Sequence, residues 1–349
     1  MHRIPLQSLP DVINQEILRF MTPSEIFLAS MTSKKTRKLI KRNIYKVDEV
    51  GVDFEKRAKV YIKVGGKSLN VVGFYFHRWN GVVDWKDNKE WQFLENIVII
   101  PSISSNSSGW SSIRYQVRSI HSYICDVFNI DASQLSVKFS DFIHHNLFDI
   151  GTVKKCTIME GEIGTRNSSE LFEQQKNMIL LVIERSREIS ACGYAYFYQH
   201  VPTVIHRNTQ IRVNWFLTRF QGQHGLLENS FLTGFYVKAF LKLWSYQKMD
   251  NLVSMIAYQS VERLFDYERV LEVLEEKLRN SEAKTLKALQ AEKPSEKRIY
   301  SYEEIITQEH EFEADTFDCD GGYDVVRNSD GKRATIKISK DYFMFFVWP

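Results

Sequence analysis

The glycine-rich stretch VGGKSLN, residues 64–70, is the first place where residue types and spacing could do chemistry. Gly66, Lys67 and Ser68 resemble the end of a phosphate-binding loop, in which backbone amides and a lysine hold the phosphates. That pattern requires a glycine five residues before Gly66, and Tyr61 stands there. A short turn between VYIKV and LNVVGFYF accounts for the glycines better. The sequence therefore predicts a hairpin here and no nucleotide site.

A second candidate, residues 316–327, resembles the start of a calcium-binding loop. Asp318, Asp320 and Gly321 stand at the register that such a loop uses. Its first ligand position, however, is Thr316, and the position that requires a bidentate glutamate is Arg327. The loop cannot supply the charge that the ion needs, so we expect a glycine turn.

The remaining chemical candidates lack a workable spacing. His144 and His145 are adjacent, whereas two metal ligands on a helix stand three or four residues apart. There is no Gly-x-Ser-x-Gly elbow, and no Cys or Ser is linked by spacing to a histidine base. The cysteines form no Cys-x-x-Cys pair and are expected to be reduced and mostly buried: Cys125, Cys156, Cys192 and Cys319. The sequence thus predicts no catalytic residue, no cofactor, no metal and no enzymatic activity.

The charge balance also predicts no nucleic-acid partner and no membrane. Lysine and arginine number 46 against 43 acids, a net charge of +3. The basic segment at residues 33–45 favours a solvated helix face over a phosphate-binding surface, because it lacks interleaved aromatic residues. The opening residues MHRIPLQSLP have no apolar run typical of a signal peptide, and no later stretch could span a membrane. We expect an intracellular protein, cytoplasmic and/or nuclear.

Three short helices are predicted in about the first 46 residues. The first runs from Pro10 to about Phe20, and the third from about Ser33 to Tyr45. Thr22, Pro23 and Glu25 form a capping box with an N-terminal proline, which opens the second helix. A unit this small rarely stabilises itself. Its surplus apolar surface therefore predicts a docking face.

Beyond Val47 the pattern changes to short alternating runs typical of strands. From Leu135 onward several of them recur at intervals that suit a strand plus a helix or turn per repeat. The pattern predicts a curved, leucine-rich-repeat-like α/β domain, and the serine-rich residues 101–112 are expected to be a loop. The predicted strands are residues 59–64, 96–100, 134–140, 156–159, 211–215, 226–230, 252–258 and 334–339.

Two helices are expected near the C-terminus. One spans about Gly234 to Tyr246 and should bury Phe235, Phe240, Leu241 and either Leu243 or Trp244. The other presents one apolar face from Val270 to Leu278. Residues 300–324, which contain acids and no lysine or arginine, are expected to remain an exposed loop.

The first 46 residues resemble the F-box. The features that carry the resemblance are Leu9-Pro10, Val12, Ile13, Ile17-Leu18, Met21, Pro23, Glu25, Ile26, Ser30, Lys34, Lys35, Arg37 and Leu39-Ile40. In that family a three-helix unit docks on a Skp-type adaptor, which connects it to a cullin scaffold and a ubiquitin-conjugating enzyme. The resemblance implies that the adaptor-binding residues are Leu9, Pro10, Ile13, Ile17, Leu18, Pro23 and Ile26.

Residues 47–349 resemble the type 2 F-box-associated domain of nematode F-box families, most closely over residues 205–349. The resemblance is carried by residues 226–257, by residues 322–339 with Asp330-Gly331 as a hairpin turn, and by the terminal Val347-Trp348. It implies that this domain binds a protein substrate and that the chain is the substrate-recognition subunit of an SCF-type ubiquitin ligase. Two alternatives stay open at this point, a non-degradative interaction scaffold and an enzyme with an unrecognised active site.

Overall fold

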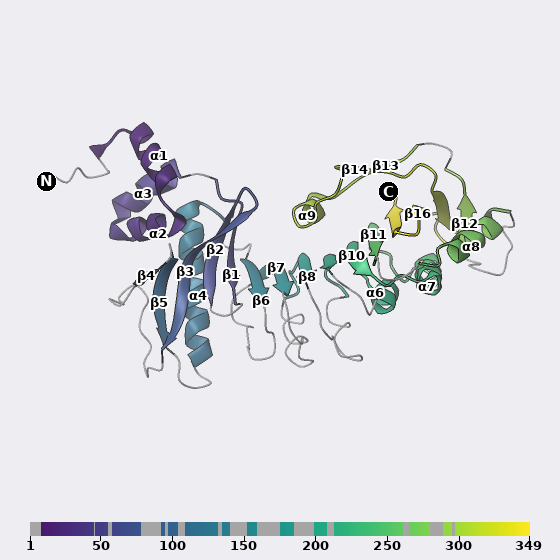
Figure 1. The fold of residues 1–349 in the computed structure, drawn as a ribbon, viewed down its shortest axis with the longest axis horizontal. Helices are drawn as coiled ribbons and strands as arrows, with labels where there is room; N and C mark the ends of the chain where they lie inside the picture. Colours follow the sequence, from purple (N-terminus) through teal and green to yellow (C-terminus); the bar gives the residue numbers. More distant parts are fainter. Residues whose placement is uncertain are drawn as a thin grey trace. The chain divides into compact units, whose positions relative to one another are not determined.

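The computed structural model describes residues 8–44, 46–54, 58–77, 92–94, 97–103, 109–131, 135–139, 152–158, 175–184, 199–207, 213–260, 265–279, 289–294 and 297–349. The chain divides into two compact units, Met1–Met159 and Glu160–Pro349. Each is a mixed unit of strands and helices, and each is described by itself below (Figure 1).

The first unit opens with three helices whose starts follow the local rules. They are α1 (Asp11–Phe20), α2 (Pro23–Thr32) and α3 (Lys34–Asn43). At the start of α2 the Thr22 hydroxyl accepts from the Glu25 amide, and the Glu25 carboxylate accepts from the Thr22 amide at 2.7 Å. The Ser33 hydroxyl accepts from the Thr36 amide at 3.0 Å and caps α3 in the same way. The predicted capping box and the three predicted helices are confirmed.

A mixed sheet and one long helix complete the first unit. In the sheet the strand order is β7-β6-β1-β2-β3-β5-β4, and the long helix α4 (Gly109–Phe128) packs on β1, β2 and β5. Buried valines and isoleucines of the strands and of α4 form the core between them. The strands are β1 (Glu49–Asp53), β2 (Lys59–Val64), β3 (Lys67–His77), β4 (Gln92–Leu94), β5 (Ile97–Ile103), β6 (Leu135–Phe139) and β7 (Val153–Ile158).

The glycine stretch at residues 64–70 joins two antiparallel strands, as predicted. Gly65 and Gly66 have φ values of 54° and 79°, a backbone region that favours glycine, and they form the turn from β2 to β3. The Gly65 amide donates to the Asp48 carboxylate at 2.7 Å. These glycines serve the hairpin.

The prediction of a loop at residues 101–112 is wrong for the residues of this range that the structure describes. Residues 101–103 end β5, and α4 begins at Gly109. Serine clusters usually mark loops because the hydroxyls compete for backbone groups, but here the apolar residues that follow give α4 a buried face against the sheet. The buried face includes Val117, Ile120 and Ile124.

The second unit contains a sheet that is parallel at one side and antiparallel at the other. Its order is β8-β9-β10-β11-β17-β16-β15-β12, with β8 to β11 parallel to one another. The strands are β8 (Leu180–Ile183), β9 (Thr203–His206), β10 (His224–Ser230), β11 (Ser254–Gln259), β12 (Leu289–Glu292), β15 (Tyr323–Arg327), β16 (Arg333–Ile338) and β17 (Tyr342–Val347). The α/β character is confirmed, whereas a leucine-rich-repeat-like curvature stays a prediction.

The strand predicted at residues 211–215 is wrong, because Val213 begins the helix α6 (Val213–Arg219). Alternation of apolar residues over only five positions is compatible with a strand and with a helix, and the residues that follow decide which of the two forms. Phe216, Leu217 and Phe220 are buried at helical spacing, and the rings of Phe216 and Phe220 stack at 4.7 Å. The tertiary contacts of these residues favour the helix.

The predicted helix near residue 234 is α7 (Gly234–Ser245), and it packs beside α6 and α8 (Glu268–Arg279). Phe240, Leu241 and Trp244 are buried, as predicted. The Phe240 ring meets the rings of Phe343 and Phe345 of β17 edge to face, at 5.5 and 5.1 Å. Phe235 was expected in this core and is 70% exposed instead, because it lies on the opposite side of the helix.

The opposite face of the same sheet is covered by the acidic segment. Residues 299–318 form β13 (Ile299–Ser301), the single-turn helix α9 (Glu304–Thr307) and β14 (Thr316–Asp318), so the expected loop is partly structured. Tyr300, Ile306 and Cys319 pack on apolar side chains of β8 to β11 and β17. Figure 1 shows α6 and α7 on one side of these strands and β13, α9 and β14 on the other.

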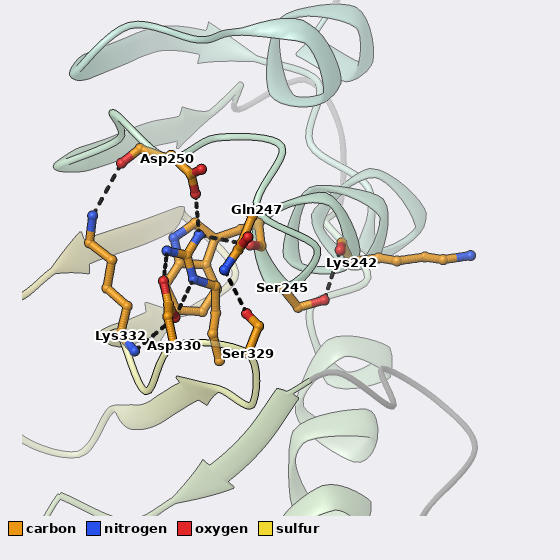
Figure 2. Close-up of polar contacts among 9 residues, drawn as sticks. Lys242, Ser245, Gln247, Asp250, Ser329, Asp330 and Lys332 are labelled. Carbon is orange, nitrogen blue, oxygen red and sulfur yellow. Dashed lines mark hydrogen bonds and ion pairs between the residues drawn. The ribbon is translucent and has the colours of Figure 1, made fainter.

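A buried arginine ties the hairpin of β15 and β16 to the end of α7. Arg327 donates to the Asp330 carboxylate at 2.5 Å and to the Asp250 carboxylate at 2.8 Å, and its guanidinium lies 5.0 Å from the centre of the Trp244 ring. Figure 2 labels Asp250 and Asp330, the two acceptors of these hydrogen bonds. The hydrogen bond from Arg327 lowers the pKa of Asp330 below its usual value. Gly331 has a φ of 73°, which confirms the predicted turn at Asp330-Gly331. The network thus fixes the hairpin next to the core helix.

No helix among the described residues is long and apolar enough to cross a membrane.

The burial of Phe240 predicts a stability difference between two phenylalanines of α7. Phe240→Ala should lower the free energy of unfolding of the second unit by about 3–5 kcal/mol, because it leaves a cavity against Phe343 and Phe345. Phe235→Ala, the matched control on the exposed side, should change it by less than about 0.5 kcal/mol. Urea denaturation of the full chain measures both. Equal losses in the two variants would contradict the packing described here.

Candidate docking surface on the N-terminal helices

Large apolar side chains are exposed on α1. Phe20 is 87% exposed, Val12 71% and Ile13 46%, and Pro10 just before the helix is exposed as well. A ten-residue helix gains little from its own propensity and normally buries its apolar face. Three large apolar side chains in solvent on one short helix therefore mark a candidate docking surface.

The exposed residues share one side of α1. At roughly 100° per residue, Val12, Ile13 and Phe20 fall within an arc of roughly 100°, and Asn14 and Leu18 lie on the other side. Asn14 and Leu18 are both buried. The exposed apolar side chains thus share one side of α1, which also carries the exposed Glu16, and α1 is held to the rest of the unit by its opposite side.

The segment before α1 is fixed by a buried side chain of the helix. Asn14 donates from Nδ2 to the carbonyl oxygen of Leu9 at 3.0 Å, and the Asn14 amide donates to the carbonyl oxygen of Pro10 at 3.1 Å. Leu9 is half-buried. Leu9 and Pro10 are therefore held at the end of the exposed face of α1.

The second helix, α2, has a different environment, because it packs on the sheet and on α4. Pro23, Ile26 and Phe27 are buried. The Ser24 hydroxyl donates to the carbonyl oxygen of Val71 in β3 at 2.8 Å, and the Phe27 ring meets the Tyr123 ring of α4 edge to face at 5.8 Å. This helix is part of the core of the first unit.

The third helix, α3, is attached to α4 by charge. Lys41 donates to the Asp126 carboxylate at 2.7 Å, and Arg37 lies 3.9 Å from the same carboxylate. The Arg37 guanidinium is also 5.4 Å from the centre of the Tyr123 ring. These contacts fix the helical unit against the sheet domain that follows it.

The structure divides the predicted adaptor-binding residues into two groups. Leu9, Pro10, Ile13 and Ile17 are exposed or half-buried. Leu18, Pro23 and Ile26 are buried within the chain. In this conformation only the first group is available to a partner, and contact of any of them with an adaptor stays a prediction.

Two exposed residues, Val12 and Phe20, were not among the predicted adaptor-binding residues. Their signal in the sequence is helical spacing, since both lie on the side of α1 that carries Ile13. Deciding which side faces solvent required the tertiary contacts of Asn14 and Leu18.

The other chemical candidates do not form a site. Asp318 binds the Asp320 amide at 2.9 Å and pairs with Lys297 at 2.9 Å, and Gly321 has a φ of 76°, so this segment is the predicted turn. No group of three or more potential metal ligands occurs in the described parts of the chain. His144 and His145 lie outside the described residues.

A cysteine and a histidine do lie together on α4. Cys125 Sγ is 3.6 Å from His121 Nε2. Burial raises the pKa of Cys125 to about 12 and lowers the pKa of His121. The thiol therefore stays protonated at neutral pH, and a nucleophilic thiolate is not formed.

Comparison with protein families identifies an F-box domain at residues 6–48. This range contains the three helices and the exposed face of α1, and an F-box domain indicates an adaptor-binding role of the SCF type. A search of curated proteins and a search of solved structures each returned no match.

The different environments of α1 and α2 predict opposite results for two matched substitutions. Phe27→Ala should destabilise the first unit by about 3–5 kcal/mol, because Phe27 is fully buried against Tyr123. Phe20→Ala should leave stability within about 0.5 kcal/mol of the wild type. Thermal unfolding followed by circular dichroism compares them. A large loss of stability in the Phe20 variant would show that α1 is covered by the chain itself.

Proposed function

We propose that the chain is the substrate-recognition subunit of an SCF-type ubiquitin ligase. Its F-box domain docks on a Skp-type adaptor, which links it to a cullin, and the rest of the chain holds a protein target. The observation that carries the proposal is the F-box domain at residues 6–48, with an exposed apolar face on α1. A cytoplasmic and/or nuclear location is part of the proposal.

In this proposal the chain positions the target and does not itself make or break a covalent bond. In this role the chain raises the effective concentration of the target at the conjugating enzyme. A receptor of this kind must hold its docking helices firmly, and the contacts of α2 with β3 and α4 support this. The proposal therefore assigns no enzymatic activity to the chain.

For the target-binding part we propose a type 2 F-box-associated domain within residues 47–349, with its best-matched region at residues 205–349. Support comes from the order of elements: β10, α7 and β11 form a strand, helix and parallel strand, and β15 and β16 form the closing hairpin. The turn of that hairpin and the end of α7 are joined by Arg327. In this proposal the domain supplies the surface that holds the target.

Adaptor binding tests the first half of the proposal. Changing both Leu9 and Pro10 to Ala should weaken binding to a purified Skp-type adaptor by at least about tenfold, since burying one such side chain contributes about 1.5–3 kcal/mol. Isothermal titration calorimetry with the full chain measures the change. Phe235→Ala, which removes an exposed aromatic ring in the second unit, is the matched control and should bind like the wild type.

Thermal melts of the same proteins separate docking from folding. A double variant that melts like the wild type and binds the adaptor with unchanged affinity would remove the main support for the proposal. If the variant instead melts early, Phe20→Ala provides the same test on a residue whose side chain the chain does not cover.

Depletion in cells tests the second half of the proposal. Affinity purification of the wild type and of the Leu9/Pro10 double variant identifies proteins that bind the chain independently of the adaptor. For a substrate-recognition subunit, the abundance of at least one such protein should rise by about twofold or more when the chain is depleted. Unchanged abundance of every bound protein would favour the non-degradative scaffold.

A further inference from the structure

The helix α3 carries an unusual excess of positive charge. Its sequence KKTRKLIKRN contains six lysines and arginines and no acid. Two of them, Arg37 and Lys41, are paired with Asp126 of α4. The remaining four are free to serve another purpose, because no described residue forms an ion pair with any of them. They are Lys34, Lys35, Lys38 and Arg42, and together they are called the basic strip below.

The basic strip lies on one side of α3. All four residues are exposed, and at roughly 100° per residue they fall within an arc of roughly 100°. Thr36 and Ile40, the buried residues of α3, lie on the opposite side. From Lys34 to Arg42 the helix rises by about 12 Å, so four cations stand close together on one short surface.

The basic strip lies on the helix that neighbours the exposed apolar side chains of α1. Helix α3 packs directly on α1, whose exposed side chains include Val12, Ile13 and Phe20. On α1 itself, Glu16 is paired with Arg19 at 2.7 Å. The other acid of α1, Asp11, is exposed and forms no ion pair with the strip, so no described acid of the neighbouring helix is paired with these four cations.

Four like charges on one ten-residue helix have an electrostatic cost that no ion pair with a described residue offsets. Like charges three or four residues apart destabilise a helix by a few tenths of a kcal/mol per pair. A cluster of one sign beside an apolar docking face is, however, the arrangement that speeds association with a partner of opposite charge. The cost and the placement together point to a partner.

We propose that the basic strip steers the adaptor to the F-box by pairing with an acidic surface on the adaptor that lies beside its apolar groove. The inference rests on the proposed function and names the charge of that partner. The apolar face of α1 holds the adaptor, and the basic strip accelerates the encounter. The position of the strip on a helix that packs against α1 favours a protein partner over nucleic acid, and no aromatic stacking platform lies along the described part of α3.

Association kinetics at two ionic strengths test the proposal. The purified full chain is mixed with a purified Skp-type adaptor at about 50 mM and at about 500 mM NaCl, where the Debye length falls well below the size of the strip. The variant carries Lys34→Gln, Lys38→Gln and Arg42→Gln, because glutamine has a helix propensity close to that of lysine and arginine. At low salt its association rate constant should fall by about tenfold, and its dissociation rate constant should change by less than about threefold.

The control variant removes three positive charges from exposed positions in the second unit, Lys242→Gln, Lys248→Gln and Arg269→Gln. It should keep the wild-type rate and the wild-type salt dependence. An equal loss in the control would attribute the effect to net charge and overturn the proposal, as would an unchanged association rate in the strip variant. In both of those cases the chain still binds the adaptor, so the proposed function is not contradicted.

Two further outcomes would also contradict the inference. If the wild type does not bind the adaptor at either salt concentration, both the proposed function and this inference are wrong. If the strip variant binds the adaptor normally and loses binding to vesicles of phosphatidylserine and phosphatidylcholine, the strip recognises an anionic membrane surface and the inference is wrong.

Discussion

The structure of the N-terminal part depends on one constraint: three helices of ten residues each contain more apolar surface than they can bury among themselves. The helix α2 is apolar on most of its surface, so it needs cover from several sides. It obtains this cover from α3, from β3 and from α4. Once α2 is enclosed in this way, α1 lies at the edge of the unit and only one of its sides can be covered. The exposed face of Val12, Ile13 and Phe20 is the consequence.

Features with a local cause could be predicted from the sequence. The capping box at Thr22 and the glycine hairpin at residues 65–66 depend on a few neighbouring residues, and both are present. Helix α6 and the start of α4 could not be predicted. The alternating apolar residues before and in α6, and the serines at the start of α4, are each compatible with more than one secondary structure, and tertiary contacts determine which one forms. For the same reason the exposure of the predicted adaptor-binding residues could not be derived from the sequence. The sequence indicates that α1 and α2 are apolar, but only the fold shows that Ile26 is covered by the chain and Phe20 is not.

The second unit meets the same need for cover in a different way, since both faces of its sheet are buried by its own segments. Helices α6 to α8 cover one face with aromatic residues such as Phe240 and Trp244, and the segment from β13 to β14 covers the other with Tyr300 and Ile306. An acidic segment can do this because its apolar residues point to the sheet while most of its acids stay in solvent. Phe235 of α7 and Tyr246, which follows this helix, are then among the few large apolar side chains of the described second unit that remain exposed. The target-binding surface that we propose for this unit would therefore depend more on polar groups and loop shape than on a broad apolar face.

The attachment of the F-box to the sheet also determines how binding can work. A free three-helix unit would have to order itself when it meets a partner, and the ordering would reduce the affinity. Here Ser24, Phe27 and Lys41 hold the helices against β3 and α4 before any partner arrives. The apolar face of α1 is thus pre-organised, and the free energy gained by burying it is available for affinity. The same attachment couples the position of α1 to the sheet of the first unit.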